Sequence, residues 1–168
     1  QPENDIMVSE NSPFIKANSP YGATKQIGER IIEDVYLSTK KSRFLNLRYF
    51  NPIGSHSSCE IGEFPIGTPD NLIPFVTQTA IGKRDSLTVF GNDYNTPDGT
   101  CIRDYIHVVD LANAHVKGLV WLLQQTDGAH ESVNIGTGKG TSVKEIIDIF
   151  EKESGLSLNW RYGERRPG

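Results

Sequence analysis

The chain has 168 residues, of which 36% are hydrophobic and 23% charged, and its formal net charge is −4. This length suits one domain or part of a larger protein, and the acidic balance without a long basic run excludes a nucleic-acid-binding role. No apolar stretch approaches the roughly 20 residues that a membrane-crossing helix needs, and two cysteines are too few for a disulfide scaffold, so we expect a cytoplasmic protein.

The first eighteen residues are polar and irregular and resemble a loop. A helix is predicted to begin directly after them, because Ser19 can cap it and Pro20 suits its first position. Ile27, Ile31 and Val35 recur at four-residue spacing, which predicts a buried apolar stripe along this helix.

Tyr21 and Lys25 are the most informative pair in the chain. Four positions apart on a helix, their side chains lie on one face, one turn from each other. An ammonium near a phenol stabilises the phenolate, which equips a tyrosine to act as a general base. An ordinary helix start with an exposed lysine fits the same spacing, so the pair alone leaves both interpretations open.

The next segments read as an α/β protein. Residues 43–50 form a predicted strand that Asn51 and Pro52 close, and a strand after such a helix indicates an αβ unit of a parallel sheet. Residues 54–71 are rich in glycine, proline and serine, which favours a domain crossing or a binding loop. Further helices are predicted at 72–81, about 109–125 and 142–154, and further strands at 87–90, 105–108 and 132–135. The helix at 109–125 is expected to bury Leu111, Leu119 and Leu122.

Residues 136–140 hold three glycines between a strand and a helix, as a dinucleotide-binding loop does. The third glycine comes too early for that loop. Ser142 and Glu145 instead form a predicted capping box, so the segment is expected to be a strand-to-helix turn.

Two arginines and two asparagines are candidates for binding a polar ligand. Arg103 and Arg166 could grip a diphosphate, because a guanidinium presents a planar fork of donors to phosphate oxygens. Asn51 and Asn71 lie in proline-flanked loops, and Phe90 could stack on a base. The alternatives are surface ion pairs, Asx turns and core packing. The four histidines show no metal-ligand spacing, so no metal is expected.

In chain order, four segments resemble the UDP-glucose 4-epimerase family of extended short-chain dehydrogenases. They are Pro20 to Lys25, Leu47 to His56, Val89 to Tyr94 and Arg103 to Leu111. The Tyr-x-x-x-Lys pattern is shared across short-chain dehydrogenases, whereas the combination with the other three segments is specific. The resemblance runs from about Ser19 to Pro167.

The resemblance implies the rear part of an NAD-binding Rossmann domain plus a smaller α/β substrate-binding domain. Residues 1–55 would hold the last Rossmann elements, and residues 56–168 would hold mostly the nucleotide-sugar domain. Residues from about 102 to 136 could return to the Rossmann domain.

The resemblance also implies an isomerase of galactose metabolism that interconverts UDP-glucose and UDP-galactose with NAD, through a 4-keto sugar. Tyr21 would take the proton of the sugar 4-hydroxyl, and Lys25 would hold the nicotinamide ribose. Phe50 would lie beside the cofactor with these two residues. The implied substrate-binding residues are Tyr49, Asn51, Asn71, Leu72, Phe90, Arg103, Tyr105 and Arg166. The resemblance leaves a homodimer open for the intact protein.

Three departures from the family pattern matter. The glycine-rich NAD loop and the upstream Ser or Thr partner do not occur in these residues, and Asp70 replaces a usual asparagine. We therefore expect an interior piece of a longer protein, inactive alone. The alternatives are another nucleotide-sugar enzyme of this type, a dehydratase or reductase, and a non-catalytic nucleotide-sugar-binding remnant.

Overall fold

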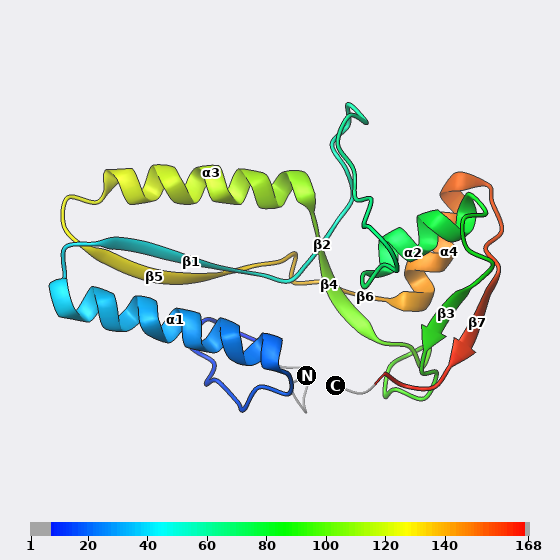
Figure 1. Cartoon of the computed structure of the whole chain (residues 1–168), viewed down its shortest axis with the longest axis horizontal. Coiled ribbons are helices and arrows are strands. Elements are labelled where there is room, and N and C mark those ends of the chain that lie inside the picture. Colours follow the sequence, from blue (N-terminus) through cyan, green and yellow to red (C-terminus); the bar gives the residue numbers. More distant parts are fainter. Residues whose placement is uncertain (1–7, 167–168) are drawn as a thin grey trace. The chain divides into compact units, whose positions relative to one another are not determined.

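The computed structural model describes residues 8–166, which divide into two compact units. One unit comprises residues 8–50 and 110–136, and the other comprises residues 51–109 and 137–166, so the chain passes between the units three times (Figure 1). The assignment of these units to a Rossmann domain and a substrate domain stays a prediction. Within residues 8–166, no helix combines the length and the apolar composition needed to cross a bilayer.

The first unit is built on two parallel strands, β1 (Arg43–Tyr49) and β5 (Ala129–Ile135), which pair along their whole length. The helices α1 (Pro20–Thr39) and α3 (Val108–Gln124) lie on opposite sides of this pair (Figure 1). Alternation along β1 explains the layers, because Leu45 points to α3 whereas Arg48 points to α1. The predicted helices and the parallel pairing are confirmed, although β5 begins three residues earlier than expected.

Helix α1 begins as its sequence predicts. The Ser19 hydroxyl accepts a hydrogen bond from the backbone N–H of Gly22 at 3.1 Å, and Pro20 occupies the first turn. The helix ends at Lys40, whose φ of 51° is left-handed.

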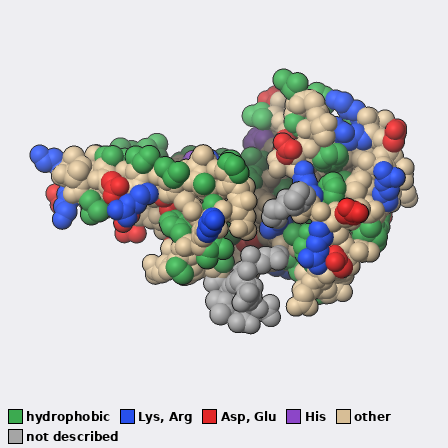
Figure 2. All heavy atoms as spheres, turned by 60° about the horizontal axis from the view of Figure 1, so that its bottom comes forward, with side chains coloured by type: hydrophobic (Ala, Val, Ile, Leu, Met, Phe, Trp, Pro, Cys, Tyr) green, Lys and Arg blue, Asp and Glu red, His purple; other side chains and the backbone are tan. Residues whose placement is uncertain are grey.

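The predicted buried stripe of α1 is wrong for this structure. Ile27, Ile31 and Val35 are 58%, 57% and 43% exposed, and apolar side chains reach the surface along this unit (Figure 2). Helix α1 instead turns Glu29 and Tyr36 toward the strands. Glu29 pairs with Arg48 at 2.6 Å, and the Tyr36 ring lies 5.6 Å from the His130 ring. Helix α1 therefore packs on the side of Glu29 and Tyr36, and not on the side of its apolar stripe.

The prediction for Leu119 on α3 is also wrong, because this side chain is 58% exposed. Helix α3 approaches β1 through Gly118, where an added Cβ would lie 2.7 Å from Leu45 Cδ2. Leu111 and Leu122 were predicted to be buried and are partly buried. They lie on the same side of the helix as Gly118.

The second unit contains two small sheets and two helices. Strand β4 (Ile102–His107) lies between β2 (Asn51–Ile53), which is parallel to it, and β6 (Gly140–Ser142), which is antiparallel. Strand β3 (Leu87–Phe90) pairs in parallel with β7 (Trp160–Gly163). Helices α2 (Leu72–Ala80) and α4 (Val143–Ser154) pack around a core of Val76, Leu87, Val89, Ile147 and Leu158 (Figure 1). The short strands β2, β6 and β7 were not predicted.

The capping box at the start of α4 is confirmed. The Ser142 hydroxyl accepts from the Glu145 backbone N–H at 3.0 Å, and the Glu145 carboxylate accepts from the Ser142 N–H at 2.7 Å. The same hydroxyl donates to Asp98, whose carboxylate also accepts from the Thr100 backbone and hydroxyl. The turn at Asp98 is thereby tied to the start of α4.

Candidate active site

Tyr21 and Lys25 occupy the first two turns of α1 and lie together. The Lys25 ammonium is 5.0 Å from the centroid of the Tyr21 ring, and Tyr21 is 72% exposed. Among residues 8–166, no carboxylate pairs with Lys25 and no hydrogen bond engages its ammonium. The Tyr21 phenol is accessible, and the N–H groups of the Lys25 ammonium are available to donate hydrogen bonds to a ligand.

Tyr49 and Phe50 lie at the carboxyl end of β1, in the same unit. The Phe50 backbone N–H donates to the Ile135 carbonyl at 3.0 Å, and the Tyr49 ring lies 6.3 Å from the His115 ring. They are 50% and 39% exposed. In parallel α/β sheets, ligands bind outside the carboxyl ends of the strands, so both rings lie where a ligand is expected.

In the second unit, the β2–β4 pairing brings together Asn51, Arg103 and Tyr105. Asn51 is the register partner of Tyr105, and Arg103 precedes Tyr105 by two residues, so the three side chains share one face. The Asn51 amide donates to the Asp104 carbonyl at 3.0 Å, which fixes its orientation. Burial raises the pKa of Tyr105, partly opposed by Arg103, so its hydroxyl remains a donor at neutral pH.

Phe90 and Arg166 form a second group in this unit. The Arg166 guanidinium lies 5.0 Å from the Phe90 ring centroid, and Phe90 is 40% exposed at the end of β3. Neither Arg103 nor Arg166 pairs with a carboxylate within residues 8–166, which disfavours the surface-ion-pair alternative. Both guanidinium groups are available to an anionic ligand.

Asn71 and Leu72 lie at the start of α2. The Asn71 amide donates to the Glu63 carboxylate at 2.8 Å and makes no capping hydrogen bond, so the Asx-turn alternative lacks its usual contact. Leu72 packs against the core of its unit. Within the described part of the chain, no hydrogen bond or ring contact joins these two residues to the Arg103 or Phe90 groups.

Asp104 has a role that the sequence analysis missed. Its carboxylate accepts hydrogen bonds from the Thr137 N–H at 2.9 Å, the Thr137 hydroxyl at 2.7 Å and the Gly138 N–H at 2.8 Å. These are the backbone amides that a phosphate would use in a glycine-rich loop. The Thr137 and Gly138 amides are therefore bound by an internal carboxylate, which supports the rejection of the dinucleotide-loop interpretation.

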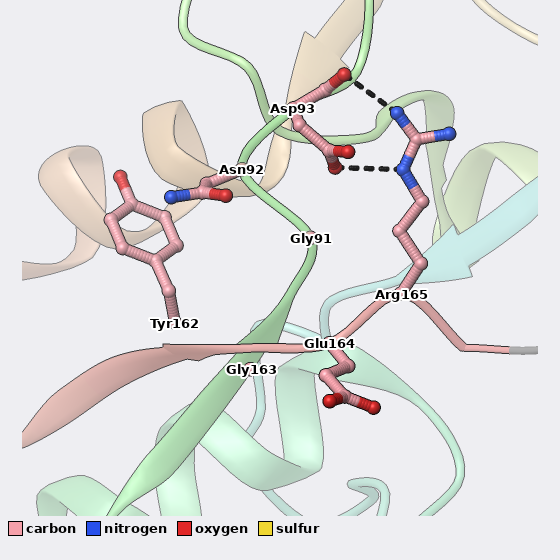
Figure 3. A pocket seen from close by; sticks show the side chains of 7 residues that line it. All are labelled: Gly91, Asn92, Asp93, Tyr162, Gly163, Glu164 and Arg165. Atoms are coloured by element: carbon pink, nitrogen blue, oxygen red, sulfur yellow. Dashed lines mark hydrogen bonds and ion pairs between the residues drawn. The ribbon is translucent and has the colours of Figure 1, made fainter.

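Arg165 was also missed, although it adjoins Arg166. It lines a depression of about 520 Å³ at the ends of β3 and β7, together with Gly91, Asn92, Asp93, Tyr162, Gly163 and Glu164 (Figure 3). Its Nε donates to Asp93 Oδ1 at 2.7 Å, and this hydrogen bond holds the pKa of Asp93 below its ordinary value. The sequence signal was the arginine pair itself.

The chain belongs to the NAD dependent epimerase/dehydratase family, which matches residues 1–136. Among its relatives, the chain is 54% identical to UDP-glucose 4-epimerase 4 of Oryza sativa subsp. japonica over 151 residues, which are 90% of this chain and 41% of that protein. It is 50% identical to UDP-glucose 4-epimerase of Bacillus subtilis over 166 residues, covering 96% of this chain and 48% of that one.

A solved structure agrees with these sequence matches. The crystal structure of UDP-glucose 4-epimerase from Bifidobacterium longum, in complex with NAD+ and UDP, superimposes with a TM-score of 0.90 at 42% identity. The match covers 96% of this chain and 47% of that one. The chain thus spans about half the length of the relatives it matches, and it is an α/β piece similar to part of their structures.

Proposed function

We propose that this chain is part of an NAD-dependent UDP-glucose 4-epimerase, which interconverts UDP-glucose and UDP-galactose. The observation that carries the proposal is the identity of about half of all residues to plant and bacterial enzymes of that name. The Tyr21–Lys25 pair and the available arginines supply the chemistry that such a reaction needs.

The Tyr21–Lys25 pair fits both the sugar and the cofactor. The Tyr21 phenolate would accept the proton of the sugar 4-hydroxyl as the C4 hydride leaves, and would return the proton after the 4-keto sugar has presented its other face. Lys25 would stabilise the phenolate and donate to the hydroxyls of the nicotinamide ribose, because no carboxylate in the described chain occupies its ammonium. When bound, NAD supplies a reversible hydride acceptor. Phe50 would border the cofactor.

The second unit would bind UDP. Arg103 and Arg166 would engage the diphosphate, because charged, bidentate donors suit phosphate oxygens. Asn51 and Tyr105, on the same face as Arg103, would donate further hydrogen bonds. Phe90 would stack on the uracil ring. Asn71 and Leu72 would complete the enclosure of UDP, and Tyr49, which belongs to the first unit, would lie near the sugar.

The domain assignment follows from the same proposal. The unit of residues 8–50 and 110–136 would hold the last Rossmann elements, and the other unit would be the smaller substrate domain. A cytoplasmic location and a homodimer of the complete protein stay predictions.

The test is an assay of the complete protein with UDP-galactose and NAD. We expect UDP-glucose to form, and its absence with folded protein rejects the proposal. A dehydratase would instead release water from the sugar, and a non-catalytic remnant would bind UDP and convert nothing. Chromatography of the nucleotide sugars separates these three outcomes.

A further inference from the structure

The backbone beyond β7 is held to its unit by few contacts. The last backbone hydrogen bond between β3 and β7 runs from the Gly91 N–H to the Gly163 carbonyl at 2.9 Å. Among the described residues, Glu164, Arg165 and Arg166 make no backbone hydrogen bond outside this segment. The position of Arg166 over Phe90 therefore depends on side-chain contacts.

Arg165 supplies those contacts. Its Nε donates to Asp93 Oδ1 at 2.7 Å, and its Nη2 donates to the Asp93 carbonyl at 2.6 Å (Figure 3). Its guanidinium carbon lies 4.2 Å from the centroid of the Tyr94 ring. A planar guanidinium can make these three contacts at once, whereas an ammonium has no fork and no flat face.

Gly91 makes this close packing possible. Its φ is +85°, which favours glycine, and an added Cβ would lie 2.6 Å from the Tyr94 ring and 2.9 Å from Arg165 Cγ. Gly91, Asp93, Tyr94 and Arg165 form one cluster, here named the Arg165 anchor. It fastens the segment after β7 to the loop after β3.

We infer that Arg165 is a positioning residue, which holds the Arg166 guanidinium over Phe90 for the diphosphate of the nucleotide sugar. The inference rests on the proposed function. Two of the three guanidinium nitrogens of Arg165 already donate to Asp93, and the Glu164 carboxylate lines the same depression. A phosphate would meet two carboxylates there, so Arg165 acts through its neighbour and does not touch the ligand.

The test compares UDP binding by calorimetry in the complete protein and in its Arg165→Ala, Asp93→Ala and Arg166→Ala variants. Losing one well-placed charged contact should weaken UDP binding about tenfold in each variant. The Asp93→Ala result is decisive, because it frees Arg165. If Arg165 bound phosphate directly, freeing it would leave UDP binding unchanged or tighter, and that result overturns the inference.

Two further measurements show whether Arg165 acts through Arg166. In the Arg166→Ala background, Arg165→Ala should cause no further loss of UDP affinity, and an additional tenfold loss contradicts the inference. Arg165→Lys should bind UDP with an affinity between wild type and Arg165→Ala, since lysine keeps one contact to Asp93 and lacks the fork. In the epimerase assay, Arg165→Ala should raise the KM for UDP-galactose about tenfold with a smaller change in kcat.

Arg161 provides the matched control. It is an exposed arginine on β7 whose side chain makes no hydrogen bond or ion pair among residues 8–166. Arg161→Ala should leave UDP binding unchanged, and thermal unfolding should confirm that every variant is folded. A complete protein that binds no UDP before substitution rejects the proposed function and this inference with it. UDP binding that Arg165→Ala leaves intact rejects only the inference.

Discussion

The Tyr21 side chain projects from the first turn of α1 with most of its surface exposed, and the Lys25 ammonium lies 5.0 Å from its ring. Under the proposed function the hydroxyl would carry the proton, whereas the ring contacts the Lys25 ammonium. A substitution that removes only the hydroxyl therefore tests the chemistry alone.

We predict that Tyr21→Phe in the complete protein lowers epimerisation by about 100-fold or more, because a positioned acid–base group is lost. UDP affinity should stay near that of wild type, since the expected UDP-binding residues lie in the other unit. Initial rates and calorimetry measure the two quantities. Tyr36→Phe, on the same helix but packed against His130, is the control and should keep its rate. A Tyr21→Phe variant with full rate would show that another group is the base.

Asp98 should make stability depend on pH. Although burial pushes its pKa up, hydrogen bonds from Ser142 and Thr100 lower the pKa below the ordinary value. A depressed folded-state pKa stabilises the fold fully above the unfolded value of about 4, and this contribution is lost as the pH falls through the folded value. We expect Asp98→Ala to cost about 2 kcal/mol at pH 7, because it leaves buried hydroxyls unpaired.

Urea unfolding between pH 7 and pH 2.5 measures this effect. The difference between wild type and Asp98→Ala should shrink below about pH 4. Asp85→Asn is the control, since no hydrogen bond of its side chain occurs among the described residues. A difference that is the same at both ends of this range would contradict the prediction.

At the scale of elements, the apolar stripe of α1 and the core of the second unit should respond differently to the same substitution. Ile147 on α4 is fully buried, whereas Ile31 on α1 is 57% exposed. Ile147→Ala should lower the free energy of unfolding by about 2–5 kcal/mol, because it leaves a cavity. Ile31→Ala should change it by about 0.5 kcal/mol. Equal losses in denaturant unfolding would mean that this stripe is buried in solution.

The elements of this fold were predictable where their signals are local. Ser19-Pro20 and the Ser142–Glu145 pair predicted the starts of α1 and α4, and both helices begin there. The side on which α1 packs was not predictable, since the Arg48–Glu29 contact joins two elements. The spacing of Ile27, Ile31 and Val35 predicted that the opposite side of α1 is buried. Short strands such as β2 and β7 have too few residues to show a period.

The candidate site was predictable only in part for the same reason. The Tyr21–Lys25 spacing follows from helix geometry, whereas the joint position of Asn51 and Tyr105 follows from strand register. Spacing along the chain does not give that register. The roles of Arg165 and Asp104 were not predicted, because their hydrogen-bond partners lie in distant segments of the sequence.

At the scale of the whole molecule, ligand-binding groups are unevenly distributed. The seven residues that are expected to enclose UDP lie in the second unit: Asn51, Asn71, Leu72, Phe90, Arg103, Tyr105 and Arg166. The sequence of 168 residues contains no glycine-rich NAD loop after a strand. The segment that most resembles such a loop is residues 136–140, and there the N–H groups of Thr137 and Gly138 already donate to the Asp104 carboxylate.

We therefore predict that the 168-residue chain binds UDP more tightly than NAD. Calorimetric titration with each ligand under identical conditions measures both affinities, and uridine serves as a control that lacks the diphosphate. UDP should bind more tightly than uridine, because under the proposed function the arginines would contact its phosphates. Tighter binding of NAD than of UDP would require a phosphate site other than the Gly136–Gly140 turn.

The pairing of β1 with β5 has a consequence for protein synthesis. Residues 43–49 leave the ribosome long before residues 129–135, so the edge of β1 that pairs with β5 stays open while the intervening segments emerge. An open edge of this kind can pair with another nascent chain. We expect slow translation between these segments to lower the yield of soluble protein, and chaperones that shield nascent strands to restore it.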